Sequence, residues 1–225
     1  MSATTQGPML ELSDIHVHLS GRPVLRGISL AVAPGHVVGL VGRNGAGKTT
    51  TLRTAMGLVP AGAGHIRLDG HDLLRAPAHA RARLGVGYMP EDRRLIGPMT
   101  VAENILLPLW ATGARYDGTL DRVYRLMPEV RDLADRRAGL LSGGQQKMVA
   151  LARALATGTR LLLLDEPFEG LAPGLVSRLS DVIRALRQGS LGILICESDP
   201  RALHNLADVV YTIERGEILS VHEVA

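Results

Sequence analysis

The stretch Gly42-Arg43-Asn44-Gly45-Ala46-Gly47-Lys48-Thr49 determines the fold that we predict for this chain. It matches the pattern G-x-x-x-x-G-K-[ST], which arises by chance in about one chain in a hundred. It follows the apolar run His36–Val41 and precedes the helically spaced Lys48–Leu58. Glycines let the backbone curl until its N–H groups point inward at the positive end of a helix, where they hold nucleotide phosphates. The stretch therefore predicts a strand, a phosphate-binding loop and a helix, in this order.

The side chains of this loop have separate predicted roles. Lys48 is one of only two lysines in the chain, the other being Lys147. A compact ammonium fits among the β- and γ-phosphate oxygens where a planar guanidinium does not, so we expect Lys48 to neutralise them and to be catalytic. The Thr49 hydroxyl is expected to hold Mg²⁺. The predicted nucleotide contacts are Gly42, Arg43, Asn44, Gly45, Ala46, Gly47, Lys48, Thr49 and Thr50.

Two acidic residues follow an apolar run further along the chain. Leu161–Leu164 predicts a buried strand, and Asp165 and Glu166 come at its C-terminal end, the edge where ligands of open α/β sheets bind. We predict that Asp165 holds Mg²⁺ through water and that Glu166 polarises or orients the attacking water. Two solvated acids at a strand end are the alternative, and the phosphate loop upstream argues against it.

The remaining periodicity predicts an α/β domain around these strands. Residues 9–17 and Val24–Val32 predict an antiparallel pair, whereas strands alternating with helices predict a parallel sheet covered on both faces. We expect one domain over residues 1–225, in which 1–91 and about 158–225 form the core and about 92–157 form an inserted helical lobe. Further strands are expected at Gly64–Leu68, Val86–Met89, Arg160–Asp165, Leu191–Cys196, Asp208–Glu214 and Glu217–Val221, and helices at Val101–Trp110, Gly118–Met127, Gly143–Ala156, Gly174–Arg187 and Arg201–Leu206.

Composition narrows the class of protein. The 225 residues suffice for one domain, and the longest apolar runs fall far short of the roughly 20 residues of a membrane-spanning helix. Met1–Pro8 has neither a basic start nor an apolar stretch, so we expect no secretion signal and a cytoplasmic location. Cys196 is the single cysteine and is expected to be buried. Arginines are scattered and only 3% of residues are aromatic, so we expect no nucleic acid partner.

A second glycine pair occurs in Leu141-Ser142-Gly143-Gly144-Gln145. Ser142 is a suitable N-cap, Gln145 completes a capping box, and the glycines present N–H groups at a helix start, so the segment predicts a second anion site. It resembles, residue for residue, the LSGGQ signature of the ATP-binding cassette (ABC) family, whose motif order the chain follows from Leu10 to Val221. The resemblance implies a RecA-like phosphate-loop NTPase core with a parallel sheet, an N-terminal antiparallel β subdomain and an inserted α-helical subdomain.

The same resemblance implies an assembly. In this family the signature of one subunit closes over the γ-phosphate held by the phosphate loop of another subunit. Ser142, Gly143, Gly144 and Gln145 are therefore expected to bind the nucleotide of a second cassette. The implied assembly is a head-to-tail dimer with two ATP molecules and their Mg²⁺ at its interface, and the implied activity is ATP hydrolysis.

Three positions depart from the family's usual pattern. Leu19 stands where an aromatic residue usually stacks on adenine, Glu91 where a glutamine usually senses Mg²⁺, and Ser198 where a histidine usually contacts the γ-phosphate. We expect Leu19 and Ser198 to lie at the nucleotide and Glu91 to bind the metal, since a carboxylate is a suitable ligand. Without the aromatic ring, base selectivity is weakened, and the short serine predicts slow turnover or an asymmetric pair of sites.

Three segments indicate a branch of the family: Pro90–Arg94, Pro98–Asn104 and Gly170–Pro173. They resemble the shorter ATPase subunit of branched-chain amino-acid importers and of their urea and amide relatives. The implied partners are a second ATPase subunit, identical or not, and transmembrane permeases, through which an extracytoplasmic solute-binding protein is reached. The implied location is the inner face of the cell membrane.

Two hypotheses about activity follow. In the first, ATP-driven closing of the dimer delivers the stroke to the permeases and hydrolysis resets it, so turnover depends on Lys48 and Glu166. In the second, the chain is a catalytically weak, nucleotide-responsive subunit whose Ser142–Gln145 segment completes the site of a partner cassette. The missing aromatic residue and histidine favour the second hypothesis, and the intact Glu166 favours the first.

Overall fold

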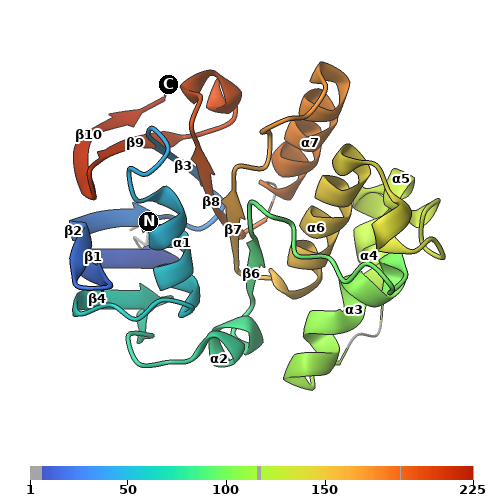
Figure 1. Ribbon diagram of the computed structural model, residues 1–225, viewed down its shortest axis with the longest axis horizontal. Helices are drawn as coiled ribbons and strands as arrows, with labels where there is room; N and C mark the ends of the chain where they lie inside the picture. Colours follow the sequence, from blue (N-terminus) through green and yellow to red (C-terminus); the bar gives the residue numbers. More distant parts are fainter. Residues whose placement is uncertain (1–6, 116–117, 188, 225) are drawn as a thin grey trace, which may run out of the picture.

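The described residues of the computed structural model, 7–115, 118–187 and 189–224, form two β-sheets with helices packed against them (Figure 1). One sheet has four strands in the order β2-β1-β4-β5, and the other has six in the order β10-β9-β3-β8-β7-β6. Helix α1 (Lys48–Met56) contacts β2 of the first sheet and both β7 and β8 of the second. The phosphate loop that precedes α1 is therefore placed where the two sheets come together.

The four-stranded sheet is antiparallel. β1 (Leu10–Leu19) pairs with β2 (Arg22–Val32) and with β4 (Ala63–Leu68), and β4 pairs with the short β5 (His71–Asp72). Buried and less buried residues largely alternate along β1 and β2, as expected for a sheet with one face on the core. The predicted antiparallel pair is confirmed, with β2 beginning two residues earlier than expected.

The six-stranded sheet supplies the edge on which the site is built. Val41 at the end of β3 lies opposite Glu197 of β8, and Asp165 at the end of β7 lies opposite Cys196. Parallel strands place their carboxyl ends at one edge, so these acidic residues meet there. The parallel strands are β9 (Val209–Glu214), β3 (Val37–Val41), β8 (Gly192–Glu197), β7 (Leu161–Asp165) and β6 (Val86–Met89), and β10 (Glu217–Glu223) pairs antiparallel with β9.

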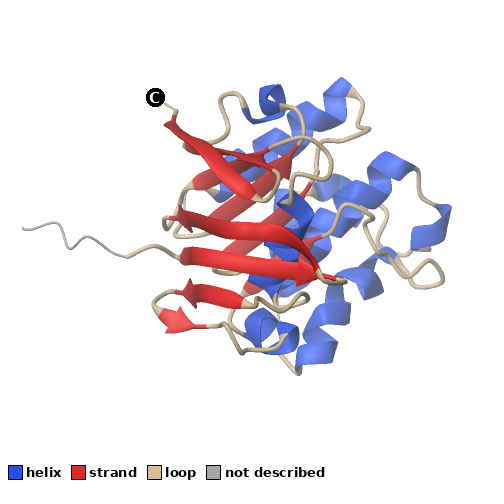
Figure 2. Ribbon diagram, turned by 60° about the vertical axis from the view of Figure 1, so that its left-hand side comes forward, coloured by secondary structure: helices blue, strands red, loops and turns tan. Residues whose placement is uncertain are grey.

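Each face of this sheet packs into its own hydrophobic core. In β7, Leu161 and Leu163 belong to the core shared with α1 and the antiparallel sheet, whereas Leu162 and Leu164 belong to the core under α6 (Gly143–Thr157). This alternation follows from the two-residue period of a strand. Cys196 is fully buried in the first core, as predicted. Figure 2 shows the strands on one side of the molecule and most helices on the other.

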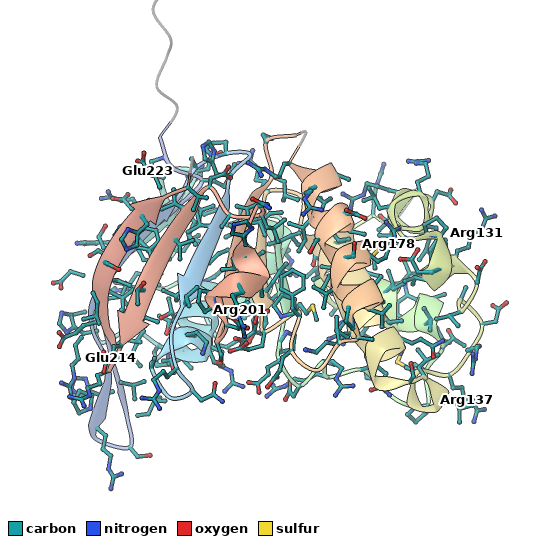
Figure 3. All side chains as sticks on the ribbon, turned by 90° about the horizontal axis from the view of Figure 1, so that it is seen from above. Arg131, Arg137, Arg178, Arg201, Glu214 and Glu223 are labelled. Carbon is teal, nitrogen blue, oxygen red and sulfur yellow. The ribbon has the colours of Figure 1, made fainter. Side chains whose placement is uncertain are left out.

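The helical part of the chain packs against the hydrophobic core that lies under α6. It comprises α3 (Val101–Thr112), α4 (Thr119–Leu126), α5 (Pro128–Arg131) and α6. A capping box between Thr100 and Glu103 begins α3. Helix α7 (Pro173–Leu186) is tied to this part because Arg178 donates to both carboxylate oxygens of Glu129, at 2.9 and 3.1 Å, and to the Leu126 carbonyl. Figure 3 shows Arg178 on α7 and Arg131 and Arg137 further out on the helical part.

Some elements differ from the sequence-based expectation. The predicted helix Arg201–Leu206 is a short 3₁₀ turn, Pro200–Leu203, which Asp199 caps by accepting from the Arg201 N–H. The helix α2 (Ala78–Arg83) and α5 were not expected, because each is too short to show a helical apolar stripe. Among the described residues, no helix combines the length and apolar character that crossing a membrane takes.

Candidate active site

The phosphate loop runs from the end of β3 into α1. Gly47, at the N-cap position of α1, has φ 118°, in the left-handed region that favours glycine, and no side chain caps the helix. At Gly42 a Cβ atom would come within 2.3 Å of the Ile213 carbonyl oxygen of β9, so only glycine fits. The first N–H groups of α1 are therefore free to point into the loop, as a phosphate site requires.

Lys48 is the centre of a polar cluster in which Lys48 and Glu166 are buried and Ser198 is exposed. Its ammonium donates to the Gly42 carbonyl at 2.6 Å and to the Ser198 hydroxyl at 3.1 Å, and it pairs with the Glu166 carboxylate at 3.0 Å. Ser198 in turn donates its hydroxyl proton to Glu166 at 2.6 Å, and its N–H donates to the other oxygen of that carboxylate at 3.1 Å. The structure thus brings together the predicted Lys48, Glu166 and Ser198, and Asn44 Oδ1 lies 2.9 Å from the Ser198 hydroxyl.

Glu166 keeps its charge in spite of its burial. Burial alone would raise the pKa of this carboxyl group, but hydrogen bonds from Ser198 and Glu197 and the pairing with Lys48 outweigh it and bring the pKa below its usual range. The neighbouring Glu197 behaves in the opposite way, because burial and the nearby Glu166 raise its pKa to about 8. At neutral pH Glu166 therefore favours its ionised form and Glu197 its protonated form.

The Thr49 hydroxyl and the Asp165 carboxylate lie close together near the Lys48 cluster. The Thr49 hydroxyl donates to Asp165 at 3.2 Å, and the Tyr88 hydroxyl lies 3.5 Å from the other oxygen of Asp165. Burial raises the pKa of Asp165 to about 6, the hydrogen bond from Thr49 opposes the shift, and the charge of Glu91 adds to it. Hydroxyl and carboxylate oxygens are what Mg²⁺ prefers, usually from one or two protein groups together with phosphate and water.

A cavity of about 350 Å³ opens over Lys48, Thr49 and Glu166, and Asp165 is not among the residues that line it. A nucleotide with Mg²⁺ fits its chemistry, because loop N–H groups, one ammonium and an oxygen donor set converge on it. Glu91, predicted as a metal ligand, is in its wall, whereas Leu19 is exposed at the end of β1 and is not among the residues that line it. The lining residues are Val24, Asn44, Gly45, Gly47, Lys48, Thr49, Thr50, Glu91, Glu166 and Glu169.

The predicted signature segment lies at the start of α6. Ser142 accepts from the Gln145 N–H at 3.3 Å, and its own N–H donates to the Gln145 side chain at 3.0 Å, so the predicted capping box is present. Ser142 and Gly143 are exposed. Gly143 and Gly144 line a second cavity, which shares Glu91 and Glu169 with the first. The structure therefore does not bring the signature segment into the cavity over the phosphate loop of the same chain.

The sequence profile of the ABC transporter family matches residues 25–169, well over half of the chain. The chain is an ATPase domain of this family. As an ABC ATPase it binds ATP with Mg²⁺, hydrolyses it, and acts as a dimer with transmembrane components to energise a transporter.

Two relatives of this ABC ATPase with different named functions are similar to it over most of their length. BraG of Pseudomonas aeruginosa, a high-affinity branched-chain amino acid transport ATP-binding protein, is 35% identical and is aligned over 94% of this chain and 91% of its own. LptB of Escherichia coli, a lipopolysaccharide export system ATP-binding protein, is 37% identical, with 89% of this chain and 84% of LptB aligned. The two similarities leave the transported substrate open.

Solved structures share the fold of this ABC ATPase. The ADP conformation of MJ1267, an ATP-binding cassette of an ABC transporter, superimposes with a TM-score of 0.85 at 25% identity, over 97% of this chain and 92% of MJ1267. The dimeric structure of the cassette MJ0796 also gives a TM-score of 0.85, at 21% identity. The predicted α/β cassette, with its parallel core sheet, antiparallel β subdomain and helices, is confirmed.

Several residues of the ABC ATPase site were not predicted as part of it, including Glu169 in the cavity wall. Val24 lines the cavity from β2, Glu197 is buried behind Glu166, and Lys147 of α6 donates to the Glu166 carbonyl. One feature of the sequence could have pointed to Lys147: it is the second of only two lysines in an arginine-rich chain. Val24 and Glu197 look like ordinary strand residues, so nothing in their spacing marks them.

Proposed function

We propose that this ABC ATPase energises an importer of branched-chain amino acids or of related small polar solutes such as urea and amides. The observation that carries its role as the motor is the cluster under the phosphate loop, in which Lys48 and Glu166 are buried and paired and Ser198 holds Glu166 from the exposed side. The similarity to BraG over more than nine tenths of both chains supports the importer branch. The segments Pro90–Arg94 and Gly170–Pro173 support the same branch through their resemblance to such subunits.

In the proposed chemistry each residue acts where the geometry places it. Lys48 holds the β- and γ-phosphate oxygens, while Thr49 and Asp165, with Glu91 beside them, hold Mg²⁺, which neutralises developing charge when bound. Glu166 is ionised and accepts a hydrogen bond from the attacking water, which orients the water toward the γ-phosphate. Ser198 keeps the Glu166 carboxylate in place through its hydroxyl and N–H. Leu19 is proposed only as an apolar edge for the base.

The proposed dimer is head to tail. The exposed Gly143 and the adjoining Gly144 at the start of α6 present backbone N–H groups and the positive end of a long helix to an anion from outside the chain. A second cassette that places its own phosphate loop there supplies the γ-phosphate. The pair is proposed as two copies of this chain or as this chain with a sibling.

Coupling to the permeases is proposed at a groove between the core and the helical part. We propose that residues about 92–157 form a lobe that moves against the core formed by 1–91 and about 158–225. A largely apolar groove of about 240 Å³ lies between them and includes Leu58, Tyr88, Pro90 and Pro108. A cytoplasmic helix of a permease fits such a groove. The chain then works at the inner face of the cell membrane, with an extracytoplasmic solute-binding protein on the far side of the permeases.

Two alternatives have an observation in their favour. The similarity to LptB favours the ATPase of a lipopolysaccharide export system. The serine in place of a histidine at Ser198, together with Leu19, favours a weak subunit that completes the site of a partner cassette. The intact contacts of Glu166 with Lys48 and Ser198 argue against the weak-subunit alternative.

Uptake measurements in the native host test the importer proposal. Deletion of the gene is expected to abolish uptake of radiolabelled leucine, isoleucine and valine, or of urea or a short amide. Wild-type protein expressed from a plasmid restores uptake and the Glu166→Gln variant does not. Unchanged uptake of all these solutes contradicts the proposal, and a failure of lipopolysaccharide delivery in the same strain supports the export alternative.

A further inference from the structure

Lys147 is a buried lysine on the signature helix α6. It comes two residues after Gln145, and only 5% of its surface is exposed. Burial lowers the pKa of its ammonium group, and Glu169, Glu197 and Glu166 oppose that shift. A buried cation is costly unless its donors are satisfied, so its partners show what it does.

The partners of Lys147 are main-chain carbonyls of the segment that follows the β7 strand. Its ammonium donates to the Glu166 carbonyl at 2.7 Å and also to the Glu169 carbonyl. On the other side of this segment, the buried Glu197 of β8 accepts from the Phe168 N–H at 3.0 Å. A cation therefore holds the carbonyls and an acid holds an N–H, so that residues 166–169 are fixed from two elements far apart in the sequence.

The backbone that Lys147 holds is strained. Glu166 has φ 49°, in the left-handed region that costs a residue with a side chain roughly 1 kcal/mol or more. Such a conformation persists only where the surroundings fix it. The Glu166 N–H donates to the Cys196 carbonyl at 2.9 Å, and the Glu166 carbonyl accepts a hydrogen bond from the Lys147 ammonium. The direction of the Glu166 carboxylate toward Lys48 and Ser198 follows from this backbone.

Lys147 also connects the cavity over the phosphate loop with the cavity at the start of α6. It lines the cavity that contains Gly143 and Gly144, whereas Glu166 lines the cavity over the phosphate loop. In a head-to-tail dimer these cavities face different nucleotides. Lys147 is thus a direct link between the helix that meets one nucleotide and the carboxylate that acts on the other.

We propose that Lys147 is a positioning residue for Glu166, and that through it the signature helix supports the hydrolytic geometry of the same chain. The inference rests on the proposed role of Glu166. Lys147 acts through the main chain of residues 166–169 and does not touch the reacting atoms. Its removal should therefore lower the rate of the chemical step without weakening the binding of ATP.

A kinetic comparison of Lys147→Met with wild type tests the proposal. Displacement of a reacting group by about 1 Å costs on the order of 100-fold, so kcat should fall by about 100-fold while the Kd for MgATP changes by less than about threefold. Lys147→Arg retains the charge and several donors and should recover a large part of kcat. If the methionine variant folds poorly, Lys147→Gln can replace it, because its shorter amide reaches at most one of the two carbonyls. This variant is also expected to lose kcat while its Kd for MgATP stays close to that of wild type.

Arg122→Met is the matched control. Arg122 is half-buried on α4, burial lowers its pKa as it does for Lys147, and it donates to the Leu155 and Ala156 carbonyls near the other end of α6. Its removal should lower thermal stability but leave kcat unchanged. Amide hydrogen exchange should speed up at residues 168–170 in Lys147→Met and not in Arg122→Met.

The outcomes separate this inference from the proposed function. If Glu166→Gln is inactive while Lys147→Met has wild-type kcat, the positioning role is wrong and the role of Glu166 stands. If Glu166→Gln keeps wild-type turnover, the proposed chemistry itself is wrong. A loss of kcat in Arg122→Met equal to that in Lys147→Met would show that any damage to α6 suffices, which also contradicts a specific role for Lys147.

Discussion

The start of α1 and the start of α6 both present backbone N–H groups suited to an anion, yet they are built in opposite ways. At α1 the lysine that follows the loop is 5% exposed and bonded to Gly42, Ser198 and Glu166 of its own chain. At α6 the cap residue Ser142 is exposed and its side chain bonds to Gln145, in the adjoining turn. One is a largely buried cluster, and the other is an exposed helix start, at which we propose that a second chain supplies the ligand.

The difference in burial predicts that substitutions at the two helix starts will affect folding and activity to different degrees. Substitutions at the α1 site should damage both folding and activity, because they leave buried charges without partners. Substitutions at the α6 surface should damage activity far more than folding, because water replaces what is lost. The following predictions test this contrast, beginning with the largest expected effect.

Replacing Lys48 with alanine should have the largest effect. Phosphate binding loses its cation, and the buried Glu166 loses its ion-pair partner, a change that costs about 3 kcal/mol or more of folding free energy. We expect turnover below detection, MgATP binding strongly weakened, and a lower free energy of unfolding in urea. Wild-type stability in this variant would mean that the buried cluster does not depend on the ion pair.

Glu166→Gln should abolish hydrolysis but keep binding. The amide retains the size and one acceptor but cannot carry the charge that polarises water, so kcat should fall by about a hundredfold or more. Phosphate release under saturating MgATP and equilibrium nucleotide binding measure the two effects separately. Retained turnover in this variant would assign the chemistry to another group.

Glu197→Gln should change how stability depends on pH. The folded-state pKa of Glu197, about 8, lies above its ordinary value of 4.5. Its contribution to stability is therefore fully present below about pH 4.5 and is lost as the pH rises through 8. The variant should match wild type near pH 5 and be the more stable protein at pH 9, as measured by urea unfolding. A difference in the free energy of unfolding between variant and wild type that shrinks as the pH rises would contradict the raised pKa of Glu197.

Ser142→Ala should have the smallest effect on folding. It removes the cap of α6 at an exposed position, which costs about 1 kcal/mol. ATP binding to the phosphate loop of the same chain should be unchanged. A calorimetric unfolding curve measures the loss of stability, and an ATP titration of the monomer measures the binding. A stability loss as large as that of Lys48→Ala would remove the contrast between the two helix starts.

Much of this structure could be predicted because its motifs combine fixed spacing with local geometry. The phosphate loop, the strand ending in Asp165 and the capping box of Ser142 each lie within a few residues of sequence, and all three appear where expected. The short helix Ala78–Arg83 could not be found because six residues with three alanines and two arginines show no apolar stripe. The predicted helix after Asp199 shrank to a 3₁₀ turn, since Pro200 and the Asp199 cap begin a turn that Asn205, at φ 58°, does not continue.

The contacts behind the site could not be predicted from one sequence. Lys147 reaches Glu166 across 19 positions, and Glu197 reaches Phe168 across 29. Such pairs depend on how α6 and β8 pack, which is a property of the whole fold and not of a local pattern. The motifs therefore identify the candidate nucleotide-binding residues, while the residues that hold them in place become visible only in three dimensions.

A mixing experiment tests the central claim, that a working site takes its phosphate loop from one chain and its signature helix from another. Lys48→Ala inactivates the first half. Gly143→Asp inactivates the second by placing a negative charge at the exposed helix start, where the charge itself favours the helix. Each variant alone should be inactive, and an equal mixture should regain roughly a quarter of wild-type turnover, because half of randomly formed dimers contain one intact site of two. A mixture as inactive as its components, under conditions where wild type turns over, would contradict the account.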